Sequence, residues 1–284
     1  MVEDVRLQLA HIEVAAQVYG PPDGAPVLAL HGWLDNAATF SRLAPKLAGL
    51  RIVALDFPGH GLSAHRPVGA EYSIWSYTYD VLAVADALGW SRFSLMGHSM
   101  GAITAVLLAG AVPERVERLA LIDGLLPYTA EAAEAPEKLG QALKARMALA
   151  AKRKPIYAER DRALAARQQA MGGISPDAAQ CLAERGLMTV EDGYTWRTDS
   201  ALTLPSGVRL TLAQAQAFAE AITCPVALVL AEKGLLAVQP QLLPWVERLP
   251  FTVHQLPGGH HLHLDDEAGA TRVADCFKAL FGLP

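Results

Sequence analysis

A serine between two glycines lies where a short apolar run gives way to a run rich in alanine and leucine. The stretch Gly97-His98-Ser99-Met100-Gly101 has the pattern G-x-S-x-G. Residues 92–96 before it suit a strand, and residues 100–112 after it suit a helix. In that setting the pattern is typical of a nucleophile elbow, a sharp turn that exposes the serine hydroxyl above a sheet. Glycine is needed on both sides because a side chain would collide with neighbouring elements. The helix N-terminus would favour an anion that develops beside Ser99.

A serine hydroxyl needs a base to become a good nucleophile, and that base is usually a histidine oriented by a carboxylate. Three of the nine histidines follow the last predicted strand: His260, His261 and His263. We predict that His260 is the base, because it directly follows two glycines, and that the other two pack in the loop or face solvent. Their H-H-x-H spacing lacks the i, i+4 geometry of helical metal sites and an evident carboxylate ligand, so we expect no metal site.

Two backbone N–H groups are candidates for stabilising an oxyanion. His31-Gly32-Trp33 ends one predicted strand, and Met100 directly follows the serine. We expect the N–H groups of Trp33 and Met100 to form a two-donor oxyanion hole. Asp56 also ends a strand beside this site, but its D-x-P-G-x-G setting indicates a turn, so we assign it a structural role.

The elements that must position these residues alternate between strand and helix. Two strands open the chain, and the run at 26–30 is short and wholly apolar, as expected of a strand buried on both faces. This alternation predicts a mostly parallel central sheet with helices on both faces, an α/β fold. Ligands bind beyond the carboxyl ends of such strands, where His31, Asp56, Ser99 and Asp123 all lie. The expected strands are 5–9, 11–19, 26–30, 51–55, 92–96, 116–122, 225–231 and 251–256, and the expected helices are 36–47, 74–88, 100–112, 239–249 and 267–281.

The pattern changes between residues 127 and 222, where buried-strand runs disappear and segments rich in Ala, Arg and Glu take their place. Helical segments are expected at 136–151 and 157–171. We therefore predict an inserted, mostly helical lid at 127–222, between a first core part at 1–126 and a second at 223–284. We expect the aromatic patch 194–197 to anchor this lid.

Composition limits the function classes. The chain has 284 residues and a formal net charge of −5, with no concentrated basic stripe, so we expect no nucleic-acid partner. Three widely spaced cysteines predict neither a disulfide framework nor a zinc site. The N-terminus lacks an apolar signal region, and the longest apolar run is shorter than the ~20 residues of a membrane span. We expect a cytoplasmic protein; its oligomeric state is left open.

Four motifs occur in order at residues 30–36, 56–63, 97–102 and 258–265, reading LHGWLDN, DFPGHGLS, GHSMGA and GGHHLHLD. Together they resemble the motifs of lid-bearing serine hydrolases of the α/β-hydrolase fold, in particular the serine hydrolase-like proteins and their bacterial relatives. The resemblance covers nearly the whole chain outside 127–222. It implies that fold and a serine hydrolase site, but it does not define the substrate, because the fold hosts many chemistries.

The chain departs from the common family pattern at the acid. The family usually has an Asp a few residues past the strand that follows the lid, and here that stretch is Ala231-Glu232-Lys233-Gly234. Two substitutes are open: Glu232 lies early in that loop, whereas Asp123 ends the strand before the lid, where some relatives place their acid. We prefer Asp123, and both keep the chain order Ser, acid, His.

These observations favour a serine hydrolase that cleaves a carboxylic ester or related acyl substrate through an acyl-enzyme on Ser99. We expect a small to medium-sized, largely hydrophobic substrate and no cofactor. Thioester, lactone or carbon–carbon bond hydrolysis at the same site is an alternative. A third possibility is a non-catalytic ligand-binding protein of this fold, which only the missing Asp near Gly234 favours.

Overall fold

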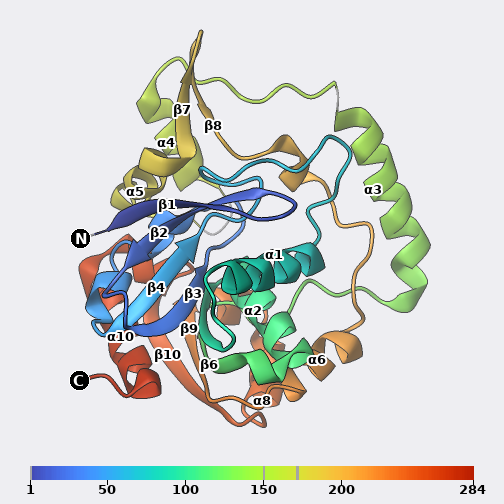
Figure 1. The fold of residues 1–284 in the computed structure, drawn as a ribbon. Coiled ribbons are helices and arrows are strands. Elements are labelled where there is room, and N and C mark those ends of the chain that lie inside the picture. The colour runs from blue at the N-terminus through green and yellow to red at the C-terminus, as the bar shows by residue number, and fades with distance from the viewer. Residues whose placement is uncertain (1, 150, 171–172) are drawn as a thin grey trace.

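The computed structural model describes residues 2–149, 151–170 and 173–284. Its centre is an eight-stranded sheet with the order β1-β2-β4-β3-β5-β6-β9-β10 (Figure 1). The pairs β1–β2 and β2–β4 are antiparallel, and the other neighbouring strands are parallel. The predicted mostly parallel sheet is thus confirmed. The strands are β1 (Glu3–Gln8), β2 (Glu13–Tyr19), β3 (Ala25–Leu30), β4 (Leu50–Leu55), β5 (Phe93–His98), β6 (Val116–Ile122), β9 (Val226–Lys233) and β10 (Phe251–Gly259).

Helices cover both faces of this sheet, and each face has its own hydrophobic core. Successive strand residues point to opposite faces, so Leu28 packs into one cluster and Val27 into the other. The first cluster receives α1 (Ile74–Ala87) and α2 (Met100–Ala111), and the second receives α10 (Glu267–Phe281). The apolar runs of the sequence are therefore explained by burial on both sides.

Two predicted helices are wrong as continuous elements. Segment 36–47 contains the 3-10 helices η1 (Ala37–Phe40) and η2 (Ala44–Lys46), although Phe40 and Leu43 are buried as their spacing suggested. Segment 239–249 divides into η6 (Pro240–Leu242) and α8 (Leu243–Val246), after the short helix α7 (Leu235–Val238). Prolines cause these breaks, because a proline fits only the first turn of a helix.

The chain between β6 and β9 holds helices and one hairpin. The antiparallel pair β7–β8 was not predicted, because its two strands are only four residues long and partly exposed. It contains the aromatic patch: Trp196 packs against the cluster around Leu182 and Ile174. The expected ends of helices 136–151 and 157–171 fall in part on residues 150 and 171, which lie outside the described residues. The elements are η4 (Ala132–Glu134), α3 (Ala135–Leu149), α4 (Arg160–Gln168), α5 (Pro176–Gly186), β7 (Leu187–Val190), β8 (Gly193–Trp196), η5 (Ser200–Thr203) and α6 (Leu212–Glu220).

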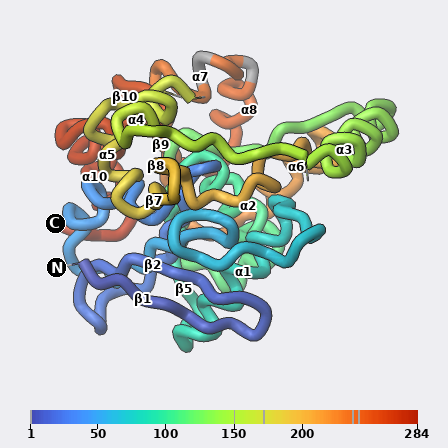
Figure 2. Tube along the Cα trace, turned by 90° about the horizontal axis from the view of Figure 1, so that it is seen from above, coloured from blue at the N-terminus to red at the C-terminus, as the bar shows by residue number. Residues whose placement is uncertain are grey.

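Helix α3 differs from the other long helices. None of its fifteen residues, all of them described, is buried, and Figure 2 shows it standing away from the sheet. Across the described residues, no helix combines the length and the apolar character needed to cross a bilayer.

Candidate active site

Ser99 lies in a strained turn between β5 and α2. Its φ is 53° and its ψ −117°, a conformation that costs a non-glycine residue about 1–3 kcal/mol. The turn is held by the Ser99 N–H, which donates to the carbonyl of Ile122 at 3.0 Å. A Cβ at Gly97 would lie 2.6 Å from the Ala102 backbone, and one at Gly101 would lie 1.9 Å from the Leu30 carbonyl oxygen. Both glycines of the motif are therefore required by close backbone packing.

His260 joins this serine to a carboxylate. Its Nε2 lies 2.9 Å from Ser99 Oγ, and its Nδ1 lies 2.6 Å from Asp123 Oδ2. The carboxylate can only accept, so Nδ1 carries the proton and Nε2 is left to accept the serine hydroxyl. The imidazole is 24% exposed, whereas the Asp123 side chain is fully buried. In this arrangement an approaching substrate can reach Ser99 and His260, and the carboxylate behind the ring is shielded from water.

The carboxylate of Asp123 is held by backbone contacts with β9 and the loop after it. The carboxylate accepts the N–H of Ala231 at 2.9 Å and that of Leu235 at 2.9 Å. Gly234 makes room for it, because a Cβ there would lie 2.1 Å from Asp123 Oδ2. The carboxylate from β6 thus lies against the loop in which the common family pattern has its Asp.

Glu232, the other acid candidate, has a different position. It is exposed near the end of β9. Of the two candidates, the described structure brings only Asp123 within hydrogen-bond distance of His260.

Trp33 and Met100, the two predicted oxyanion donors, follow the neighbouring strands β3 and β5. Met100 is the first residue of α2, and Trp33 lies in the loop after β3, just before Leu34, whose φ is 62°. Within the described part of the chain, neither the Trp33 nor the Met100 backbone N–H donates to a backbone carbonyl of a turn or loop. The Trp33 indole N–H donates to the carbonyl of Leu202 at 3.0 Å, so this side chain also ties the loop to the segment between β6 and β9.

His261 and His263 are buried rather than exposed. His261 Nε2 lies 3.1 Å from Asp35 Oδ2, and His263 Nε2 lies 3.1 Å from Thr39 Oγ1. Sequence reasoning missed Asp35 as their carboxylate neighbour. Its position two residues after Trp33 was the available signal, since it places the carboxylate beside the expected oxyanion loop.

Asp35, His98 and His261 carry metal-ligand atoms that all lie within 4.8 Å of one another, and all three are buried. The prediction that the histidines lack a carboxylate neighbour is therefore wrong. The same carboxylate is paired with the guanidinium of Arg167. The Arg167 guanidinium already neutralises the Asp35 carboxylate. We therefore describe Asp35, His98 and His261 as part of a buried ion-pair network rather than as a metal site.

Burial disfavours the charged form of two histidines around the site. Burial lowers the pKa of His98 to about 4, so this ring is neutral at pH 7. Burial also lowers the pKa of His31, whose Nε2 accepts the N–H of Phe57 at 2.9 Å. Asp56 has the structural role expected: its carboxylate accepts the N–H groups of Ala37 and Leu62, each at 2.7 Å.

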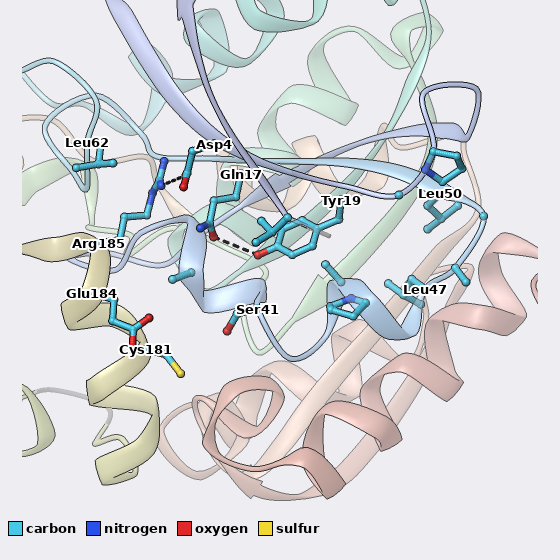
Figure 3. A pocket seen from close by; sticks show the side chains of 18 residues that line it. Asp4, Gln17, Tyr19, Ser41, Leu47, Leu50, Leu62, Cys181, Glu184 and Arg185 are labelled. Carbon is cyan, nitrogen blue, oxygen red and sulfur yellow. Dashed lines mark hydrogen bonds and ion pairs between the residues drawn. The ribbon is translucent and has the colours of Figure 1, made fainter.

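A large hollow lies elsewhere on the molecule. It has a volume of about 710 Å³ and lies beside the ends of β1 and β2, η1–η2 and α5 (Figure 3). Arg185 on its rim pairs with Asp4 and, at 2.7 Å, with the buried Asp56. None of the predicted site residues is among those that line it. The hollow is therefore separate from the group around Ser99.

Comparisons with known proteins agree with this architecture. A family model described as alpha/beta hydrolase fold matches residues 25–163. A serine hydrolase-like protein from Danio rerio is 32% identical, with 96% of this chain and 87% of that protein covered. The crystal structure of a hypothetical protein from Pseudomonas aeruginosa PAO1 is 66% identical, covers 99% of both chains and gives a TM-score of 0.97.

A thioesterase domain from the curacin biosynthetic pathway is also similar. It is 26% identical, with 96% of this chain and 99% of that chain covered and a TM-score of 0.79. The sheet order, the helices on both of its faces and these similarities lead to one conclusion: the chain belongs to the α/β-hydrolase fold family and is a hydrolase of the serine hydrolase-like group.

Proposed function

We propose that this hydrolase cleaves a carboxylic ester or related acyl compound through an acyl-enzyme on Ser99. The observation that carries the proposal is the continuous chain of contacts from Ser99 Oγ through His260 to Asp123. Nε2 of His260 takes the hydroxyl proton as Oγ attacks the acyl carbonyl carbon. The protonated ring then gives that proton to the leaving alcohol as the carbon–oxygen ester bond breaks. Water, activated by the same imidazole, releases the acid and restores Ser99.

The negative charge of the tetrahedral intermediate needs donors. We assign this role to the N–H groups of Trp33 and Met100, together with the N-terminus of α2. Asp123 keeps His260 in the tautomer that presents a basic Nε2 and stabilises the imidazolium that forms. This reaction needs no cofactor.

Residues 127–222 form the lid in this proposal, inserted between core parts 1–126 and 223–284. The hydrogen bond from the Trp33 indole to Leu202 supports it, because the loop carrying a proposed oxyanion donor is tied to the insertion. The Trp33 side chain is 39% exposed and offers an apolar surface beside the site. We therefore expect the acyl group to be largely hydrophobic.

Thioester hydrolysis is the second candidate, favoured by the similarity to the thioesterase domain. Lactone or carbon–carbon bond hydrolysis would use the same residues. A ligand-binding protein without catalysis stays a competing hypothesis, against which the intact Ser99–His260 contact weighs.

A paired substrate series tests the proposal. Wild type and Ser99→Ala are assayed with p-nitrophenyl esters of two to twelve acyl carbons and with acyl thioesters of the same lengths. We expect Ser99-dependent turnover with an optimum at one acyl length, and the ratio of kcat/KM between matched ester and thioester identifies the preferred linkage. If folded wild type and Ser99→Ala are equally inactive on every substrate, the binding-protein hypothesis is favoured.

A further inference from the structure

One buried carboxylate connects four parts of the chain around Ser99. Asp35 lies in the loop after β3 and is 1% exposed. Its Oδ2 lies 3.1 Å from Nε2 of His261 and 3.6 Å from Nδ1 of His98. Its Oδ1 pairs with Arg167 of α4. His98 directly precedes the nucleophile and His261 directly follows the base. The carboxylate therefore accepts a hydrogen bond from the neighbour of the base and lies beside the neighbour of the nucleophile.

His98 also contacts the proposed base itself. Its Nε2 lies 3.0 Å from the backbone carbonyl of His260, and the two ring centroids are 4.7 Å apart. Because the buried His98 ring is neutral, its single proton lies on Nε2, where it is donated to that carbonyl. Both the backbone and the ring of His260 are therefore held by a side chain of the elbow.

The charges in this network balance within the protein. Burial alone would raise the pKa of Asp35, but His261 and Arg167 hold it well below its usual range. Asp35 is thus an anion at pH 7, paired with the guanidinium from α4. Gly32 leaves the space for this contact, because a Cβ there would lie 2.9 Å from His98 Nδ1 and 3.2 Å from Asp35 Oδ2.

We infer that Asp35 is a positioning residue: by accepting a hydrogen bond from His261 it holds the loop that carries His260 in register with Ser99, and through Arg167 it fixes α4 of the insertion to the same loops. The inference rests on the proposed function, since the rate it controls is that of the Ser99 reaction. A displacement of about 1 Å in such a group can lower the rate by about 100-fold.

The test separates positioning from simple charge neutralisation. Asp35→Asn keeps the shape but removes the charge, and it leaves Arg167 buried without its anion. The double variant Asp35→Asn/Arg167→Gln removes both charges. Asp80→Asn is the matched control. Asp80 lies on α1, is also buried, and pairs with an arginine, Arg66, at 2.5 Å.

We expect Asp35→Asn to lower kcat by about 10- to 100-fold with KM changed less than about threefold, and to lower Tm by roughly 5–15 °C. The double variant should regain much of the Tm but keep the low kcat, and Asp80→Asn should lose Tm with kcat unchanged. Recovery of kcat in the double variant, or equal losses of kcat in Asp35→Asn and Asp80→Asn, would overturn the inference.

Two further measurements keep the test decisive. If Asp35→Asn does not fold, two variants of His261 replace it. His261→Gln retains a donor for Asp35 and should keep most of the kcat, whereas His261→Leu should lose it; equal rates would contradict the inference.

If wild type hydrolyses nothing, the proposed function fails, and proton NMR still tests positioning. The resonance of the His260–Asp123 hydrogen bond should shift or broaden in folded Asp35→Asn and not in Asp80→Asn, and an unchanged resonance refutes the claim.

Discussion

At the scale of single residues, the chemistry depends on atoms that lie far apart in the sequence. Ser99 and Asp123 both have positive φ, 53° and 43°, and each directly follows a parallel strand of the sheet, β5 and β6. Parallel strands present their carboxyl ends at one edge, so the two side chains approach the same imidazole. The residue types predicted the serine and the base, and the contacts of His260 favour Asp123 over Glu232 as the acid.

Replacing the acid candidates one at a time tests this distinction. Asp123→Asn should reduce kcat by about 10⁴-fold, because an amide can hold His260 in the wrong tautomer. Glu232→Gln should stay within about twofold of wild type, since Glu232 is exposed. Both are measured as kcat on the best ester of the series. Near-normal activity of Asp123→Asn together with loss in Glu232→Gln would reverse the assignment.

At the scale of elements, burial on two faces is what made most of the sheet predictable. β6 and α10 have the predicted bounds, 116–122 and 267–281. The apolar residues 119–122 mark the buried end of β6, and a 3.6-residue period marks α10. The failures are local: prolines divide the predicted helices at 36–47 and 239–249, and the hairpin β7–β8 is too short to show an alternating pattern.

Part of the candidate site could not be read from the sequence for a different reason. Asp35 meets Arg167 across 132 residues and His261 across 226. No local periodicity encodes such pairs, since they arise only when the loops after β3 and β10 meet each other and helix α4. The sequence therefore predicted Ser99, His260 and the preferred Asp123 as a group, but not the buried network behind them.

The loop after β9 provides a prediction at this scale. Gly234→Ala would place a Cβ 2.1 Å from Asp123 Oδ2, so it should displace the carboxylate and lower kcat by about 100-fold. Gly140→Ala is the matched control, because nothing lies within 4 Å of its Cβ position in helix α3. That control should be fully active and more stable by about 0.5–1 kcal/mol. Activity and urea unfolding of both variants check this, and a fully active Gly234→Ala would argue against close packing around Asp123.

At the scale of the whole molecule, the buried histidines make stability depend on pH. Burial lowers the pKa of four of them: His31, His60, His98 and His263. Their unfolded-state pKa is about 6.5. As the pH falls below that value, the unfolded chain takes up protons that the folded chain does not, so the free energy of unfolding must decrease.

The contribution of His98 shows how large the loss in the free energy of unfolding is. A folded-state pKa of about 4 against about 6.5 corresponds to about 3 kcal/mol lost between those two pH values. We expect urea unfolding, followed by circular dichroism, to show a steady loss of stability from pH 7 to pH 4.5, with full stability above pH 7. A free energy of unfolding that is constant or increases on acidification would contradict the buried, neutral state of these rings.

The central claim is that His260 activates Ser99, and labelling with a small fluorophosphonate tests it most directly. The probe phosphonylates only an activated serine, so folded wild type should be labelled rapidly, Ser99→Ala not at all, and His260→Ala at least 100-fold more slowly. All three proteins are checked for folding by circular dichroism. Labelling that persists in Ser99→Ala, or a folded wild type that the smallest probe leaves unmodified, would contradict the account.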